Sequence, residues 1–254
     1  MIRTSVIIPT LGRDSLKATL NSILEQGEIV HQIVVVNNGD LEIEFPDNPI
    51  IEVIRTTEKF NVSQARNVGL SSVNPDSNWI AFCDDDDIWL PGKLKLQIDY
   101  CTSRKLHASY TAALVKKSNG QVSIRPTTRY REEKSPLHQV YSKITSRQGY
   151  LPFPSFCFES SFLPLASFDE RFTEHEDLLF AQDLFMRGCR IGQIPIPLVQ
   201  INYDLRRSLT RFNTTQEVLW IKKLLTFRVR WSLVYVSRIS VLKFALMKST
   251  KENK

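Results

Sequence analysis

The sequence predicts an α/β protein with a Rossmann-like, mostly parallel central sheet flanked by helices and followed by a basic helical tail. In the first 100 residues, short apolar runs bounded by turn residues alternate with segments of helical spacing, an order typical of parallel sheets covered by helices. Residues 33–36 (IVVV) are apolar at every position, as expected of a strand that is buried on both faces.

The first half of the chain supplies strand, helix, strand, strand, helix and strand in that order. The predicted strands are 4–8, 33–36, 50–54 and 79–83. Between 16 and 24 apolar residues recur at helical spacing, and Asp14 is the expected N-cap. Residues 63–70 are predicted to form a helix that is capped by Ser63.

The second half is less regular. Apolar residues at helical spacing after Pro91 predict a helix, and 108–125 are typical of a β-hairpin whose turn contains Gly120. Residues 126–150 are polar and show no clear period, so they are expected to form a mobile loop. A strand-like stretch ends at Tyr203.

A further helix is predicted over 173–187. Thr173 and Glu176 match the spacing of a capping box, in which the hydroxyl caps the helix and the acid reaches back to its first backbone amide. This assignment makes Glu176 structural and leaves Asp177 as the acid with a chemical role. The presence of an acid at 177 is explained equally well without a chemical role, because the helix dipole favours any acid in a first helical turn.

Composition indicates a folded protein rather than a disordered or membrane-spanning one. The 254 residues are 42% hydrophobic and 24% charged, and no run of eighteen apolar residues occurs. The N-terminal residues lack the apolar region of a signal peptide, and the four cysteines show no metal-ligand spacing. These features favour a cytoplasmic protein with reduced thiols.

The net charge of +6 is unevenly distributed. Residues 206–254 carry 12 Lys or Arg and two Asp or Glu, whereas the preceding 205 residues carry 21 and 25. The tail is therefore the part of the chain that attracts anionic partners. Basic amphipathic helices with Trp, Phe and Leu bind anionic membranes, so 214–254 is predicted to make peripheral contact with the inner face of the cell membrane.

Two alternatives to membrane contact stay open for this tail. The same residues would suit a helix that packs on the catalytic domain, or on a second subunit of a homo-oligomer. Nucleic acid is not an expected partner, because no nucleic-acid-binding signature accompanies the charge.

Four consecutive aspartates at 84–87 follow the predicted strand 79–83. Adjacent carboxylates repel one another, and hard divalent cations such as Mg²⁺ or Mn²⁺ prefer carboxylate oxygens. The end of a strand is also where open α/β sheets bind ligands. In an extended chain Asp84 and Asp86 share one face, and the other two aspartates share the opposite face. A solvated acidic loop or a Ca²⁺ site is the alternative on this pattern alone.

Five segments together carry a resemblance to a known family. They are VIIPTLGR (6–13), VVVNNGD (34–40), SQARNVGL (63–70), FCDDDDIWLPGKL (82–94) and HEDLLFAQDLFMRG (175–188). In this order and at these spacings, over roughly 4–190, the chain resembles the family 2 glycosyltransferases, which have the GT-A fold. The resemblance implies a catalytic domain at 1–212, with a nucleotide-sugar-binding half (1–100) and an acceptor-binding half (101–212), and a tail at 213–254.

The resemblance also implies the site residues. Those implied to bind the nucleotide-sugar are Pro9, Thr10, Asn37, Arg66, Asp84, Asp85 and Arg207. Asp86 is implied to hold Mn²⁺ or Mg²⁺, and Asp177 to be the catalytic base. Asn37 stands where relatives commonly have an aspartate that accepts from uracil, and its amide oxygen can still accept. Arg206 and Arg207 lie where some relatives carry a late histidine, and one of the two is expected at the diphosphate.

These roles suit an inverting, metal-dependent glycosyltransferase. A divalent cation neutralises the charge on the departing nucleoside diphosphate, and a carboxylate takes the proton of the acceptor hydroxyl. One base and one leaving group give direct displacement, which inverts the sugar carbon. The expected donor is a nucleotide-sugar, with UDP favoured. The expected acceptor is a glycan or a lipid-linked molecule in polysaccharide or lipopolysaccharide biosynthesis.

Other functions remain as alternatives. A sugar nucleotidyltransferase would open with a glycine-rich loop after the first strand, whereas 9–13 contain the single glycine Gly12. A catalytically silent relative that binds a glycan or a partner protein would not need the acids Asp84, Asp86 and Asp177. A basic binding module would carry its activity in 214–254 alone.

Overall fold

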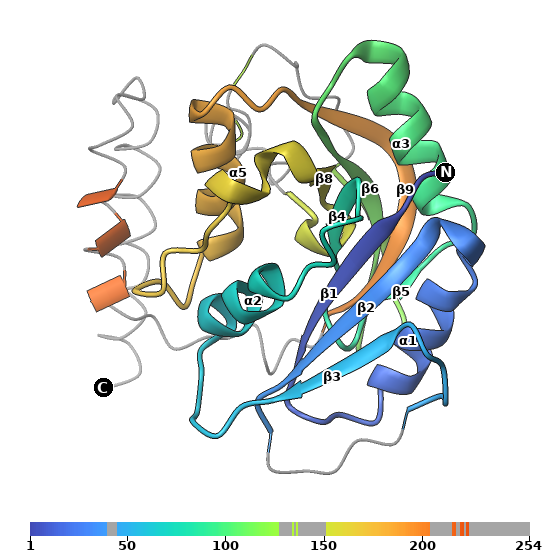
Figure 1. Ribbon diagram of the computed structural model, residues 1–254, viewed down its shortest axis with the longest axis vertical. Helices are drawn as coiled ribbons and strands as arrows, with labels where there is room; N and C mark the ends of the chain where they lie inside the picture. The colour runs from blue at the N-terminus through green and yellow to red at the C-terminus, as the bar shows by residue number, and fades with distance from the viewer. Residues whose placement is uncertain are drawn as a thin grey trace.

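One twisted sheet runs through the molecule, with helices on both faces (Figure 1). The structure is a computed structural model that describes residues 1–39, 45–126 and 151–203, together with 134, 136, 215, 216, 219, 220, 222 and 223. Arg207, nearly all of the predicted loop 126–150 and most of the tail lie outside these residues. Within the described residues no helix is long and apolar enough to cross a bilayer.

In the first half of the chain, strands and helices follow one another in the predicted order. The strands are β1 (Thr4–Thr10), β2 (Val30–Asn37), β3 (Ile51–Arg55), β4 (Trp79–Phe82), β5 (Ile88–Trp89), β6 (Ala108–Lys117), β7 (Val122–Arg125), β8 (Cys157–Glu159) and β9 (Ile191–Tyr203), of which β5 and β8 were not predicted. The α-helices are α1 (Leu16–Leu24), α2 (Val62–Ser71), α3 (Lys93–Arg104) and α5 (Glu176–Met186). Short 3-10 turns are η1 (Gly27–Ile29), η3 (Phe153–Ser155) and η4 (Ser160–Leu165).

The sheet has a parallel half and a mixed half. Its strand order is β3-β2-β1-β4-β8-β6-β9-β5, with β7 paired to β6, and the first four strands are parallel. Strand β8 is antiparallel to β4 and β6, whereas β6 and β9 are parallel. The chain moves outward from β1 to β3 and then returns through α2 to β4, on the other side of β1. This reversal leaves a crevice at the carboxyl ends of β1 and β4.

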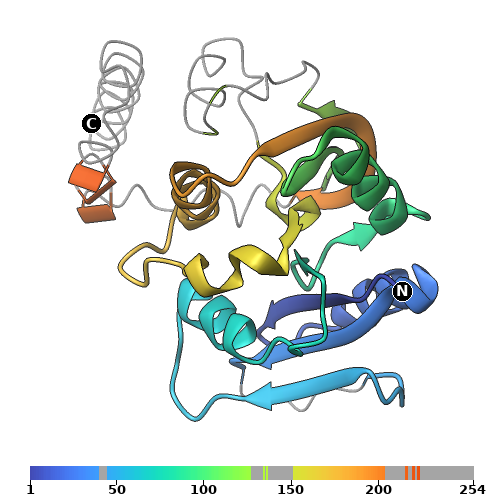
Figure 2. The same ribbon diagram turned by 45° about the horizontal axis from the view of Figure 1, so that its top comes forward.

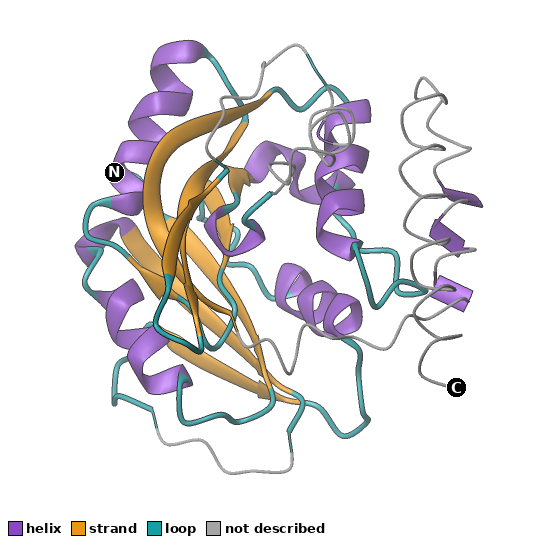
Figure 3. Cartoon of the chain, turned by 180° about the vertical axis from the view of Figure 1, so that it is seen from behind, coloured by secondary structure: helices purple, strands orange, loops and turns teal. Residues whose placement is uncertain are grey.

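Alternating residues of β1 face the two helical layers. Val6 and Ile8 belong to a core that includes apolar residues of α1 and α3, whereas Ile7 belongs to a core that includes α2 and α5. Figure 3 shows the helices on both sides of the sheet. Gly69 of α2 permits the close approach on the second face, because an added Cβ would lie 2.3 Å from Cγ2 of Ile7. The fold class predicted from the sequence is confirmed.

A cluster of phenylalanines fills the layer beneath α5. Phe82 at the end of β4 stacks on Phe153, with ring centroids 4.9 Å apart, and meets Phe168 edge-on at 5.5 Å. Phe168 in turn stacks on Phe180 of α5 at 4.2 Å. Aromatic pairs of this kind add stabilisation beyond burial of their area. The cluster fixes α5 against the carboxyl end of β4.

The predicted caps of α1 and α2 are wrong. Helix α1 begins after Ser15 rather than Asp14, with no side-chain cap bond. Helix α2 is capped by Asn61, which forms a capping box with Gln64. Ser63 is the second residue of the helix, and its hydroxyl donates to the backbone carbonyl of the distant Phe172 (2.8 Å). A tertiary partner therefore takes the hydroxyl that local sequence assigns to the cap.

Candidate active site

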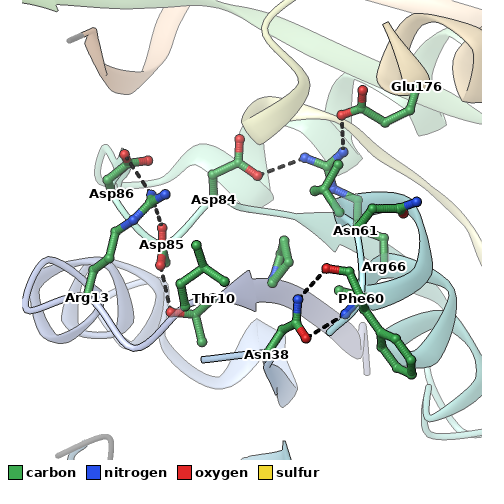
Figure 4. A pocket seen from close by; sticks show the side chains of 14 residues that line it. Thr10, Arg13, Asn38, Phe60, Asn61, Arg66, Asp84, Asp85, Asp86 and Glu176 are labelled. Carbon is green, nitrogen blue, oxygen red and sulfur yellow. Dashed lines mark hydrogen bonds and ion pairs between the residues drawn. The ribbon is translucent and has the colours of Figure 1, made fainter. Parts of the chain in front are cut away.

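A cavity of about 370 Å³ lies in the crevice at the ends of β1 and β4. That volume is in the range of small-molecule sites. Figure 4 shows side chains from β1, α2, the acidic turn and α5 converging on it. The lining residues are Pro9, Thr10, Leu11, Arg13, Asn38, Phe60, Asn61, Val62, Ala65, Arg66, Asp84, Asp85, Asp86 and Glu176. Six of the predicted site residues are among them, in one place.

The acidic run alternates as an extended chain should. Asp85 and Asp87 are buried, whereas the side chains of Asp84 and Asp86 are 37% and 26% exposed and line the cavity. Burial raises the pKa of Asp87 well above its ordinary value, and the neighbouring carboxylates of Asp84 and Asp86 add to this effect. The backbone amide of Asn202 opposes it by donating to Asp87 Oδ1 (3.2 Å).

Two partners hold Asp85 in the cavity wall. The Thr10 hydroxyl donates to Asp85 Oδ2 (2.6 Å), and the guanidinium of Arg13 lies 2.7 Å from Oδ1. The same nitrogen of Arg13 is 3.2 Å from Asp86 Oδ2 (Figure 4). Arg13 thus joins the loop after β1 to the turn after β4. Arg13 is not among the site residues predicted from the sequence, although it lies in the first of the five motifs.

On the opposite wall, Arg66 bridges two acids from distant parts of the chain. Its side chain is only 4% exposed, with Nη2 2.8 Å from Asp84 Oδ1 and Nη1 3.0 Å from Glu176 Oε1. The guanidinium carbon also lies 4.9 Å from the ring centre of Phe153 and 5.4 Å from that of Phe168. A cation over aromatic faces is stabilised by the ring quadrupole. The phenylalanine cluster thereby fixes the position of Arg66.

The charge balance around Arg66 favours its cationic form. Burial lowers the pKa of Arg66, but the carboxylates of Asp84, Glu176 and Asp177 outweigh burial, and the net shift is upward. The guanidinium therefore stays positive inside the site. Because its Nε–H has no hydrogen-bond partner among the described residues, Arg66 keeps one donor for another acceptor.

Asp177 lies beside this pair, in the first turn of α5. Burial is the main cause that raises its pKa to about 7, and Glu176 adds to the rise. Arg66 and the backbone N–H of Leu178, which donates to Asp177 Oδ1 at 2.6 Å, act in the opposite direction. A carboxyl with a pKa near neutrality suits a general base at physiological pH.

The capping box predicted at the start of α5 is wrong. The helix begins at Glu176, and the residue before it is His175, in a left-handed conformation (φ +61°) with no side-chain cap bond. Thr173 therefore lies too early to cap, and Glu176 points into the cavity toward Arg66 (Figure 4). The residue pattern of Thr173 and Glu176 matches a capping box, but it carries no information about the sharp turn of the chain at His175.

The turn after β2 places one asparagine under the cavity and another in its wall. Asn37 is buried, its Oδ1 accepts from the Gly39 backbone amide (2.9 Å), and it is not among the lining residues. Asn38 lines the cavity, accepts from the Phe60 backbone amide (2.8 Å) and donates to the Phe60 carbonyl. The proposed contact of Asn37 with a base stays a prediction. Asn38 was not predicted as a site residue, because no local sequence pattern indicates its contact with the distant Phe60.

The described residues contain no group of three His, Cys, Asp or Glu side chains arranged to hold a metal ion. Asp84 and Asp86 nevertheless present carboxylate oxygens to the same cavity. Mg²⁺ is commonly bound by one or two carboxylates together with substrate phosphates and water, rather than by an all-protein cage. The donor set therefore fits a hard divalent cation that arrives with a phosphate ligand.

Comparison with solved structures supports the fold. S. aureus TarS 1-349 matches with a TM-score of 0.61 at 17% identity, covering 79% of this chain and 60% of that chain. S. aureus TarS matches at 0.59 and 18%, covering 80% and 37%. The complex of TarS 1-349 with UDP-GlcNAc matches at 0.61 and 17%, covering 80% and 59%. The chain thus spans about three fifths of the two TarS 1-349 structures and less of TarS itself.

At the level of sequence, a comparison with curated proteins gave no match. The family model described as glycosyl transferase family 2 matches residues 5–172, about two thirds of the chain, and this span contains all of the lining residues except Glu176. The chain belongs to glycosyl transferase family 2.

Proposed function

We propose that this chain is an inverting, metal-dependent glycosyltransferase that transfers a sugar from a nucleoside diphosphate sugar to a hydroxyl group. The observation that carries the proposal is the cavity at the ends of β1 and β4, where Thr10, Arg66 and the acids of the 84–86 turn converge. Family membership supports the reaction class. The acceptor is a glycan or a lipid-linked molecule, in assembly of a bacterial surface polysaccharide or lipopolysaccharide.

The donor is best explained as a UDP-sugar. Solved structures of the similar TarS 1-349 contain UDP-GlcNAc or UDP. In this chain Arg66 supplies buried positive charge beside Asp84, which would face the ribose. A buried guanidinium attracts phosphate oxygens strongly, and Arg66 retains an Nε–H that lacks a partner among the described residues.

Mn²⁺ or Mg²⁺ would be held by Asp86, with Asp84 on the same wall. A bound ion of this kind neutralises charge on the departing diphosphate. The Arg13 guanidinium lies farther from Asp86 (3.2 Å) than from Asp85 (2.7 Å), so Asp86 is the less tightly paired of the two acids and the better metal ligand. Asp85 keeps the closer Arg13 contact and the Thr10 hydroxyl, so its role is to hold the loop after β1 against the acidic turn.

Asp177 acts as the base. As the acceptor oxygen forms its bond to the sugar carbon, the carbon–oxygen bond to the diphosphate breaks and the hydroxyl proton passes to the Asp177 carboxylate. A pKa of about 7 lets this group be ionised at neutral pH and still hold a proton well. Attack opposite the diphosphate inverts the sugar carbon. Glu176 fixes Arg66 through the 3.0 Å ion pair.

The test is release of nucleoside diphosphate from a panel of nucleotide-sugars with Mn²⁺, for the wild type and for Asp177→Asn, Glu176→Gln and Asp99→Asn. Asp177→Asn should lower kcat by about 100-fold or more while nucleotide binding stays unchanged. Asp99 is an exposed partner of Lys95 on α3, so its variant is the matched control. Full activity of Asp177→Asn together with loss in Glu176→Gln would move the base to Glu176.

A further inference from the structure

The described tail residues pack against the segment that leads into α5. Those residues, 215, 216, 219, 220, 222 and 223, are called the tail segment here (Figures 1 and 2). Leu219 packs against the apolar core that contains α5. Trp220 belongs to the same core and is only 1% exposed. Of the three possibilities that the sequence leaves open for the tail, packing on the domain is the one that the contacts of Gln216, Leu219, Trp220 and Lys223 support.

Polar contacts tie the tail segment to residues on both sides of His175. Gln216 accepts from the backbone amide of Thr173 (3.1 Å) and donates to the carbonyl of Arg171 (3.0 Å). Lys223 lies 3.5 Å from Asp169 and 3.7 Å from Asp183, one before and one within α5. The chain from 169 to 183 is therefore held at several points by one short stretch of tail.

Trp220 contacts His175 directly. The two rings stack with centroids 5.0 Å apart and an interplanar angle of 28°. Phe172 packs edge-on against the same indole at 6.4 Å, so the indole is itself held in place. His175 is nevertheless an exposed residue, and its backbone is left-handed with φ +61°.

A left-handed conformation is unfavourable for a residue with a Cβ, and it persists only where the surroundings impose it. At His175 this conformation sets the direction in which the chain enters α5. The next two residues are Glu176 and Asp177, which carry the contact to Arg66 and the candidate base. A restraint on the His175 ring is thus a restraint on both acids.

We propose that Trp220 is a positioning residue: by stacking on His175 it holds the start of α5 so that Glu176 lines the cavity and Asp177 lies beside it. The proposal rests on the proposed function in naming Asp177 as the base. It makes the tail segment part of the catalytic unit, whatever the remaining tail residues bind. Displacement of the tail segment from the domain would lower turnover without removing any group that touches the donor.

The first test separates turnover from donor binding. Trp220→Ala should lower kcat by about 10- to 100-fold, the range expected when a reacting group shifts by up to 1 Å, while KM for the donor stays within about twofold. Trp220→Phe keeps a ring over His175 and should retain most of the activity. Lys222→Ala is the control, because Lys222 is an exposed residue of the same segment. An unchanged kcat in Trp220→Ala would overturn the proposal.

The second test asks whether Trp220 acts through His175. Glycine adopts φ near +60° without strain, so His175→Gly should lose less activity than His175→Ala. In the His175→Gly background, Trp220→Ala should cost no more than about twofold further, because coupled residues are not additive. If the losses of kcat caused by His175→Gly and Trp220→Ala multiply in full in the double variant, Trp220 acts by another route. That result would overturn the proposal even if every variant folds.

The third test does not depend on transferase activity. In ¹³C-detected titrations of the Asp177 carboxyl, Trp220→Ala should move its pKa from about 7 toward its ordinary value, because the start of α5 is released into solvent. An unchanged titration in the folded variant would overturn the positioning role. Absence of turnover in the wild type would contradict the proposed function alone, and this titration would still decide the role of Trp220.

Discussion

Asp177→Asn should stabilise the protein while it removes activity. The fold keeps this carboxyl partly buried beside Glu176, and its pKa is raised to about 7. Asparagine is nearly the same size, keeps an oxygen that can accept from the Leu178 amide, and carries no charge to desolvate. The substitution therefore relieves the cost that the native site bears to hold a base near neutrality.

The sign and size of this effect follow from linkage. The unfolded chain releases the Asp177 proton near pH 3.9, whereas the folded chain holds it until about pH 7. Between these values unfolding releases a proton, so the wild-type free energy of unfolding falls as pH rises, and the deficit is constant above about pH 7. At 1.36 kcal/mol per pH unit the gap corresponds to about 4 kcal/mol, and solvent at the partly exposed carboxyl reduces this to roughly 2 kcal/mol or more.

Thermal unfolding at pH 4, 6 and 8 measures this directly. Relative to the wild type, Asp177→Asn should unfold at about the same temperature at pH 4 and about 5–10 °C higher at pH 8. Asp99→Asn, at an exposed helix position, should stay within about 0.5 kcal/mol of the wild type throughout. If Asp177→Asn is no more stable than the wild type at pH 8, or if the difference does not grow with pH, the electrostatic account of Asp177 is refuted.

Three further variants or reagents test other parts of the structure. Arg66→Met leaves two carboxylates without their shared cation and should lower the free energy of unfolding by about 3 kcal/mol in urea; a loss below 1 kcal/mol would contradict the bridging role. Gly69→Ala places a methyl group against Ile7 and should cost about 1–3 kcal/mol, whereas the exposed Ser71→Ala on the same helix should be neutral. All four cysteines are buried, and burial raises the pKa of Cys83 well above its ordinary value, so a thiol reagent should react only as fast as the protein opens; rapid labelling of native protein would contradict this.

The strand pattern and the acidic run were predictable because each depends on short-range periodicity. Strand β2 is apolar at four consecutive positions and lies inside the parallel half of the sheet, as expected. The alternation of exposure along the run, with Asp84 and Asp86 facing the cavity, follows from extended-chain geometry. The crevice between β1 and β4 follows from the same strand order.

The caps and half of the cavity wall were not predictable in this way. Helix α5 begins at a sharp turn at His175, whose ring stacks on the distant Trp220. Helix α2 begins at the local capping box of Asn61 and Gln64, and Ser63 two residues later is an equally suitable cap by residue type. Glu176 satisfies the residue pattern of a cap, but the chain direction set at His175 turns it toward Arg66. Arg13 and Asn38 reach the cavity through partners that local sequence cannot identify.

Titration calorimetry of UDP with and without Mn²⁺, on the wild type and on Asp86→Ala, tests the central claim most directly. UDP should bind to the wild type with an affinity that rises at least about tenfold with Mn²⁺, since Asp86 and Asp84 would hold the ion and the ion would neutralise charge on the diphosphate. Asp86→Ala should remove the metal dependence and leave the fold intact. UDP binding that is absent with and without Mn²⁺, or metal-dependent binding that is unchanged in Asp86→Ala, would contradict the proposed site.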